Sequence, residues 1–195
     1  TSIQQPNKEE AAKYYRIAAL KGHIESMVVY SSILEKGDGV EVDKRESARF
    51  CKMAADKGRS ESMHEYAVRL RTGDGVMVNN KESIRYHKMA ANNGNAESMY
   101  EYALYLQKQN KEEEASIYFK NAADLSHPDS MYKYYLYLKQ HNERNNNNEE
   151  MGKYLHMAFS KGQVDAVFEV GSKIPDKNIS ILYIKKAANE GHLDA

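Results

Sequence analysis

The sequence predicts an all-α fold, an α-solenoid in which helix–turn–helix repeats stack on one another. A double alanine, or a close variant of it, recurs every 29 to 36 residues, beginning at Ala18, Ala54, Ala90, Ala122, Ala158 and Ala187. A second motif keeps the same register and reads ESMVVY at 25–30, ESMHEY at 61–66, ESMYEY at 97–102, DSMYKY at 129–134 and DAVFEV at 165–170. Only 3 of the 195 residues are Pro, which favours helices over a turn-rich β architecture.

The first helix of each repeat follows from the spacing of its apolar residues. Met27, Tyr30, Ser31 and Leu34 fall at i, i+3, i+4 and i+7, which is one face of an α-helix. The same spacing starts again at three later methionines, namely Met63, Met99 and Met131. A Gly-Asp-Gly-Val segment follows the first two of these helices, at 37–40 and 73–76, and its glycines allow the positive φ that a tight turn needs.

The second helix of each repeat carries smaller residues. Ser47, Phe50, Cys51 and Ala54 share one face, and Asp43 stands where this helix needs an N-cap. Glycines follow most of the double alanines, where a left-handed C-terminal cap is expected: Gly22, Gly58, Gly94, Gly162 and Gly191. We expect the chain to begin on a helix of this second type, at about 8–21, and to end after another, at about 177–190.

These spacings predict a single solenoid over residues 1–195. A partial repeat, which is one second helix, spans 7–26, and full or shortened repeats follow at 27–62, 63–98, 99–130, 131–166 and 167–195. No repeat can bury its apolar face alone, so stacking of neighbours must supply the core. Because the chain starts at Thr1 and such an array can continue at either end, we expect a fragment of a longer protein.

Composition excludes several classes of protein. Lys and Arg total 28 and Asp and Glu total 28, so the formal charge is zero and no general attraction to nucleic acid or to a membrane surface is expected. Cys51 is the only cysteine, which excludes an internal disulfide. No apolar run approaches the roughly 20 residues of a transmembrane helix. We expect no membrane insertion and favour a cytoplasmic location, while the compartment and the oligomeric state stay open.

No catalytic, metal or cofactor site can be identified from the residues. Gly37-Asp38-Gly39 lacks the third glycine and the preceding strand of a phosphate-binding loop. The seven His form no HxxxH pair and join no pair of cysteines, so no metal site is predicted. Cys51 falls at a position of the second helix that other repeats fill with larger residues, where a buried and inert thiol is expected. We therefore predict that the chain is not an enzyme and needs no cofactor.

Two repeats carry a clear family resemblance. They read SMVVYSSILEKGDGVEVDKRESARFCKMAADKG at 26–58 and SMHEYAVRLRTGDGVMVNNKESIRYHKMAANNG at 62–94. This pattern resembles the Sel-1-like repeat (SLR), a relative of the tetratricopeptide repeat (TPR). The resemblance implies a right-handed, TPR-like superhelix that acts as a noncatalytic protein–protein interaction, scaffold or adaptor module. It weakens after residue 98, because the repeat from Met99 lacks the Gly-x-Gly-Val turn and the repeat from Met131 has HNERNNNNEE in its place.

Two alternatives stay open. The first is a structural spacer or self-assembly element of a larger multidomain protein, which can be fused to a kinase or another catalytic domain. The second and less favoured alternative is a hydrolase like those of the cysteine-rich branch of the family. That branch carries a pair of cysteines in each repeat, whereas this chain has Cys51 alone.

The resemblance also implies where a partner binds, because the first helices of such a solenoid line its concave face. Positions two, three and six after Ser62, Ser98 and Ser130 are expected to point there: His64, Glu65, Val68, Tyr100, Glu101, Leu104, Tyr132, Lys133 and Leu136. Aromatic and apolar contact area beside Glu65 and Glu101 suits a protein or peptide partner, and we expect an extended or helical peptide with some basic character. The alternative for Tyr100 and Tyr132 is packing between neighbouring first helices.

Overall fold

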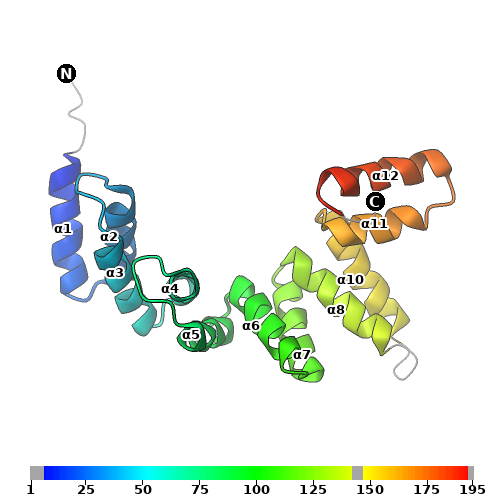
Figure 1. Cartoon of the computed structure of the whole chain (residues 1–195), viewed down its shortest axis with the longest axis horizontal. Helices are drawn as coiled ribbons and strands as arrows, with labels where there is room; N and C mark the ends of the chain where they lie inside the picture. Colours follow the sequence, from blue (N-terminus) through cyan, green and yellow to red (C-terminus); the bar gives the residue numbers. More distant parts are fainter. Residues whose placement is uncertain (1–6, 142–146, 193–195) are drawn as a thin grey trace, which may run out of the picture. The chain divides into compact units, whose positions relative to one another are not determined.

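The computed structural model describes residues 7–141 and 147–192, and all regular elements in these two ranges are α-helices (Figure 1). In chain order they are α1 (Lys8–Leu20), α2 (Ile24–Lys36), α3 (Lys44–Asp56), α4 (Ser60–Thr72), α5 (Asn80–Asn92), α6 (Ala96–Lys108), α7 (Glu112–Asp124), α8 (Pro128–Gln140), α10 (Asn148–Ser160), α11 (Val164–Ser172) and α12 (Lys177–Asn189). The all-α prediction is confirmed. Half of the asparagine-rich segment 141–150, predicted to be a loop after α8, lies outside the described residues, and its last three residues, 148–150, instead form the first turn of α10.

Contacts between residues divide the chain into two units, an N-terminal unit of residues 1–98 and a C-terminal unit of residues 99–195. The division falls within α6. In the N-terminal unit each helix from α1 to α5 packs against the next one along the chain. In the C-terminal unit the same order of packing runs from α7 through α8, α10 and α11 to α12. Packing between successive helices is the pattern expected of stacked helical hairpins.

The core of the N-terminal unit is built from the apolar faces that the sequence predicts. Met27, Tyr30 and Leu34 of α2 pack with Phe50 and Ala54 of α3, and all five side chains are buried. The Tyr30 and Phe50 rings meet edge to face, with centroids 4.9 Å apart, a favoured aromatic geometry. The alanines of the second helix leave room for this close approach.

The two Gly-Asp-Gly-Val segments, at 37–40 and 73–76, each contact the second helix of the preceding repeat. Gly75 has φ +72° and lies so close to α3 that a Cβ on it would stand 2.1 Å from the carbonyl oxygen of Lys44. Beside this contact the Nζ of Lys44 lies 2.7 Å from Oδ1 of Asp74. One repeat earlier, Gly39 and Asp38 make the equivalent contacts with Lys8. The segment is therefore an inter-helix turn that also contacts the preceding second helix.

Two turns of the C-terminal unit have a residue other than glycine at the left-handed position. The α6–α7 turn uses Asn110 at φ 57° and the α7–α8 turn uses Ser126 at φ 71°, each a left-handed position without glycine. The hydroxyl of Tyr154 in α10 donates to Oδ1 of Asp124 at 2.6 Å, as the hydroxyl of Tyr86 donates to Asp56 at 2.7 Å in the N-terminal unit. Tyrosine–aspartate hydrogen bonds of this kind join the second helices of adjacent repeats.

No helix within residues 7–141 and 147–192 is long and apolar enough to cross a membrane.

Candidate functional site

The candidate surface consists of positions two, three and six of the first helices, and we call it the first-helix surface. In the N-terminal unit its predicted members lie on α4 and are all partly exposed: His64, Glu65 and Val68. His64 also has a structural contact, because its Nδ1 lies 2.9 Å from Oγ of Ser98. The buried His87 places its own Nδ1 3.2 Å from the same oxygen. A serine hydroxyl has one proton, so at least one of these two imidazole rings must donate to it.

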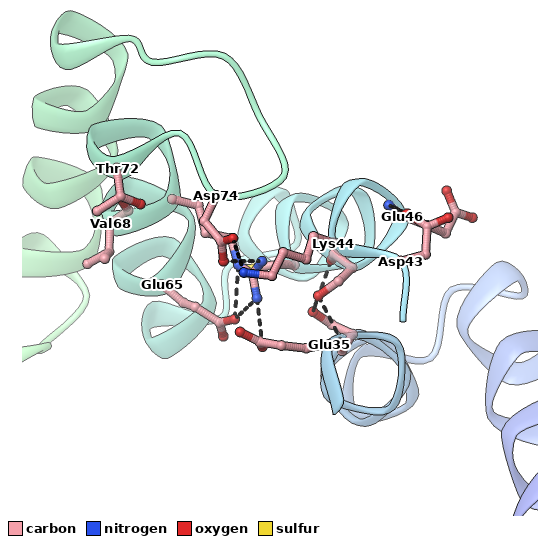
Figure 2. A network of polar contacts seen from close by, with 12 residues as sticks. Glu35, Asp43, Lys44, Glu46, Glu65, Val68, Thr72 and Asp74 are labelled. Atoms are coloured by element: carbon pink, nitrogen blue, oxygen red, sulfur yellow. Dashed lines mark hydrogen bonds and ion pairs between the residues drawn. The ribbon is translucent and has the colours of Figure 1, made fainter. Parts of the chain in front are cut away.

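A buried arginine binds the acidic side chains beside Glu65, and Figure 2 shows Glu35, Lys44 and Asp74 close to Glu65. The side chain of Arg69 in α4 is only 4% exposed, and its Nη2 donates to Glu65 at 2.9 Å and to Glu35 of α2 at 2.8 Å. Its Nη1 lies 3.4 Å from Oδ2 of Asp74, whose other oxygen is held by Lys44. The planar guanidinium thus links two first helices and the turn that follows α4.

This cluster has more negative than positive charges. Three carboxylates, those of Glu35, Glu65 and Asp74, surround Arg69 and Lys44. The side chains of the three acids remain 41%, 45% and 31% exposed. Burial alone would lower the pKa of Arg69, but the hydrogen bond that Arg69 donates to Glu65 and the charges of Glu65 and Glu35 raise the pKa above its usual value. The arginine is therefore charged, and the solvent-facing oxygens carry the excess negative charge.

Sequence reasoning did not select Arg69. The residue stands seven positions after Ser62, where the preceding repeat has Ile33 and the following one has Tyr105. A charged residue that replaces apolar ones at one repeat position is a usable signal, and Glu65 four residues earlier strengthens it.

In the C-terminal unit the predicted residues lie on α6 and α8, and all are partly exposed: Tyr100, Glu101, Leu104, Tyr132, Lys133 and Leu136. The Tyr100 ring packs against His127, with centroids 4.8 Å apart. The Tyr132 hydroxyl donates to Oε2 of Glu169 at 3.2 Å. Each ring thus has neighbours within the chain, as the packing alternative expects, and each still contributes accessible surface.

Glu169 of α11 is the centre of a second charged cluster. Its Oε1 accepts hydrogen bonds from Lys139 at 2.7 Å, from Lys173 at 2.8 Å and from the hydroxyl of Tyr135 at 2.5 Å. Burial alone would raise the pKa of this carboxyl, but the hydrogen bonds from the two lysines and Tyr135 lower the pKa to about 2. Glu169 lies three residues after Ala166, which is position three of its repeat. In the sequence, the lysine four residues later, Lys173, is the feature that indicates an ion pair here.

The cysteine and two of the histidines, residue types that often act in catalysis, make structural contacts in this chain. Cys51 is buried, its Sγ lies 3.5 Å from the carbonyl oxygen of Ser62, and burial raises the pKa of the thiol. His127 caps α8, because its Nδ1 accepts from the backbone N–H of Ser130 at 3.2 Å. His23 caps α2 in the same way. In the described part of the chain no group of three or more His, Cys, Asp and Glu side chains could hold a metal ion.

The helical hairpins and their contacts define a helical-repeat protein of the α-solenoid class. The Sel1 repeat profile matches residues 2–23, 24–58, 60–95, 96–127 and 167–192. The chain therefore belongs to the Sel1 repeat family, and the resemblance seen in the sequence is confirmed. Proteins with Sel1 repeats generally mediate protein–protein interactions, and the family is typically noncatalytic.

Solved structures agree with this fold. A protective antigen of uropathogenic Escherichia coli with an SLR fold superposes with a TM-score of 0.76 at 19% identity, over 94% of this chain and 42% of the antigen. A Sel1 repeat protein from Oxalobacter formigenes gives 0.71 at 19% identity, over 95% of this chain and 86% of that protein. An immunity protein of Pseudomonas aeruginosa gives 0.54 at 16% identity, over 99% and 78%. The chain thus spans less than half of the antigen. Comparison with curated protein sequences gives no match.

Proposed function

We propose that this chain is a noncatalytic scaffold or adaptor module that binds a protein or peptide partner on its first-helix surface. The observation that carries the proposal is the set of partly exposed aromatic, apolar and charged side chains at corresponding positions of α4, α6 and α8. Tyrosine and leucine provide apolar contact area, and tyrosine loses little conformational entropy when it is ordered at an interface. The general role of Sel1 repeats in protein interactions supports the same proposal.

The charge of the N-terminal unit supports a basic segment in the partner. Glu35 and Glu65 share one guanidinium nitrogen of Arg69, and both carboxylates are more than 40% exposed. Each carboxylate has lone pairs that Arg69 does not use, so a lysine or arginine of the partner can reach them from solvent. Charge pairs of this kind contribute mainly to orientation and association rate.

A test can compare partner capture by two variants of matched chemistry. Glu101→Lys with Leu104→Ser alters the first-helix surface on α6. Glu113→Lys with Ile117→Ser makes the same chemical changes on the exposed face of α7, a second helix. After circular dichroism has shown equal helicity, each protein is used for affinity capture and mass spectrometry. We expect partners that the wild type and the α7 variant retain and the α6 variant loses; equal capture by all three would refute the proposed surface.

A self-assembly or spacer role is the second candidate, and it is favoured by apolar side chains on the outermost described helices. Tyr14 and Leu20 of α1 are exposed, and so are Ile181 and Leu182 of α12. In a solenoid, faces of this kind pack on further repeats. Light scattering over a range of concentrations separates the two candidates: an adaptor binds its partner as a monomer, whereas a self-assembly element grows in mass with concentration.

A further inference from the structure

The surface around Glu169 carries more positive than negative charge. Lys139 and Lys173 both donate to one oxygen, Oε1 of Glu169, at 2.7 and 2.8 Å. Their side chains are 52% and 61% exposed, whereas that of Glu169 is 12% exposed. One mostly buried carboxylate therefore faces two ammonium groups that remain in contact with solvent. Each ammonium has three N–H donors, so further donors are left for a second acceptor.

A third lysine belongs to the first-helix surface of the same unit. Lys133 takes the position in α8 that Glu169 takes in α11, three residues after the reference serine or alanine of its repeat. It is partly exposed and has no ion pair with the residues in 7–141 and 147–192. Two acids oppose these three lysines, namely Glu169 and Asp165 of α11, whose charge acts on Tyr132, so one positive charge is left unbalanced. Partly exposed Tyr132 and Leu136 lie on the same helix as Lys133.

The equivalent repeat positions in the N-terminal unit have the opposite net charge, because Glu35 stands where the later repeat has Lys139. Glu35, Glu65 and Arg69 there correspond to Arg71, Glu101 and Tyr105 one repeat later, and to Lys139, Glu169 and Lys173 in the last pair of first helices. The first set places two acids on one base, and the last set places two bases on one acid. The two units therefore suit partner segments of opposite charge.

We propose that Lys133, Lys139 and Lys173 bind an acidic segment of a protein partner, whose Asp or Glu carboxylates accept hydrogen bonds from the lysines while its apolar residues contact Tyr132 and Leu136. This proposal rests on the proposed function and refines it. The part of the partner that binds the N-terminal unit is then basic, and the part that binds the C-terminal unit is acidic. Glu169 positions the two lysines that donate to it and also competes for their charge. Its replacement by glutamine is therefore expected to strengthen the binding of an acidic peptide.

The test measures fluorescence anisotropy of a labelled Gly-Glu-Glu-Leu-Glu-Glu-Leu-Gly peptide in about 50 mM NaCl, where screening is weak. A peptide with glutamine at every glutamate position measures the binding that does not depend on charge. Lys139→Gln with Lys173→Gln is expected to weaken binding of the acidic peptide about three- to tenfold, and Glu169→Gln to strengthen it about two- to fivefold. Lys185→Gln with Lys186→Gln on α12 removes the same formal charge from another exposed surface and should leave binding unchanged.

The lysine variant is expected to weaken binding and Glu169→Gln to strengthen it. The Glu169→Gln result stays informative even if that variant loses some stability, because loss of folded protein cannot strengthen binding. The proposal is overturned if the glutamine peptide binds as tightly as the acidic one, if the α12 variant weakens binding as much as the Lys139 and Lys173 variant, or if a single-stranded oligonucleotide binds at least tenfold more tightly than the acidic peptide. If partner capture still depends on Glu101 and Leu104 in that event, the proposed function stands and only the acidic site fails.

Discussion

Replacing the buried Arg69 by methionine tests whether its charge holds the N-terminal unit together. Methionine keeps most of the apolar volume of the arginine side chain, so the change isolates the guanidinium from its stem. Without the cation, Glu35, Glu65 and Asp74 face one another with only Lys44 among them. We expect the variant to fold and to be less stable than the wild type.

The expected magnitude follows from the exposure of the partners. An ion pair near a protein surface has a gross Coulomb energy of about 4 kcal/mol at 4 Å. Because the three carboxylates are 31% to 45% exposed, solvent screening reduces each pair to about 0.5–1 kcal/mol, near the upper end for surface pairs. Burial of methionine in place of a charged group returns about 1 kcal/mol. The three pairs together contribute about 1.5–3 kcal/mol, so the net loss in free energy of unfolding is about 0.5–2 kcal/mol.

Urea denaturation followed by circular dichroism measures this loss. With a slope of about 2 kcal/mol per molar urea, the midpoint should fall by about 0.25–1 M. Arg45→Met, at an exposed position of α3, is the control and should cost less than about 0.5 kcal/mol. In a Glu35→Gln, Glu65→Gln background the Arg69→Met change should cost less than half as much, since the repelling carboxylates are gone. An unchanged midpoint for Arg69→Met, or an equal cost in both backgrounds, would refute the reasoning.

Three further predictions concern single positions. Gly75→Ala should cost at least about 1 kcal/mol more than Gly94→Ala, because both glycines have positive φ but only at Gly75 would the new Cβ meet backbone, as urea midpoints can show. His127→Ala should destabilise by about 1 kcal/mol through the lost N-cap, and His127→Asn should recover most of this, as thermal melts followed by circular dichroism can show. Glu169 has a folded pKa of about 2, below its ordinary value of 4.5, so it stabilises the fold above the ordinary pKa and this contribution is lost as pH falls toward 2. Melting temperatures between pH 6 and pH 2.5 should therefore fall more steeply for the wild type than for Glu169→Gln.

Each of these predictions has an outcome that contradicts it. Equal costs at Gly75 and Gly94 would mean that the turn can move away from α3. An asparagine at 127 that is no better than alanine would show that the imidazole acts through its ring contacts and not as a cap. Parallel pH curves for the wild type and Glu169→Gln would exclude the lowered pKa of Glu169.

The fold was predictable because it depends on short-range patterns. The i, i+3, i+4, i+7 rows, the cap residues and the glycines all lie within single repeats, and they locate helices such as α1 and α12 to within about one residue. The charged clusters were not predictable in the same way. Arg69 meets Glu35, and Lys139 meets Glu169, only because adjacent repeats stack with a particular offset. His64 shows the same limit, since its contact with Ser98 depends on a side-chain rotamer that repeat position does not determine.

The separation in sequence of the contacting residues has a consequence for how the chain folds. Tyr86 and Asp56 are 30 positions apart, Arg69 and Glu35 are 34, and Tyr132 and Glu169 are 37. Loop-closure entropy grows only with the logarithm of loop length, so the entropic cost of packing one repeat on the next is nearly the same for every repeat. Contacts this local also favour fast folding. During synthesis a repeat can complete its contacts as soon as about one further repeat has left the ribosome, long before the rest of the chain exists.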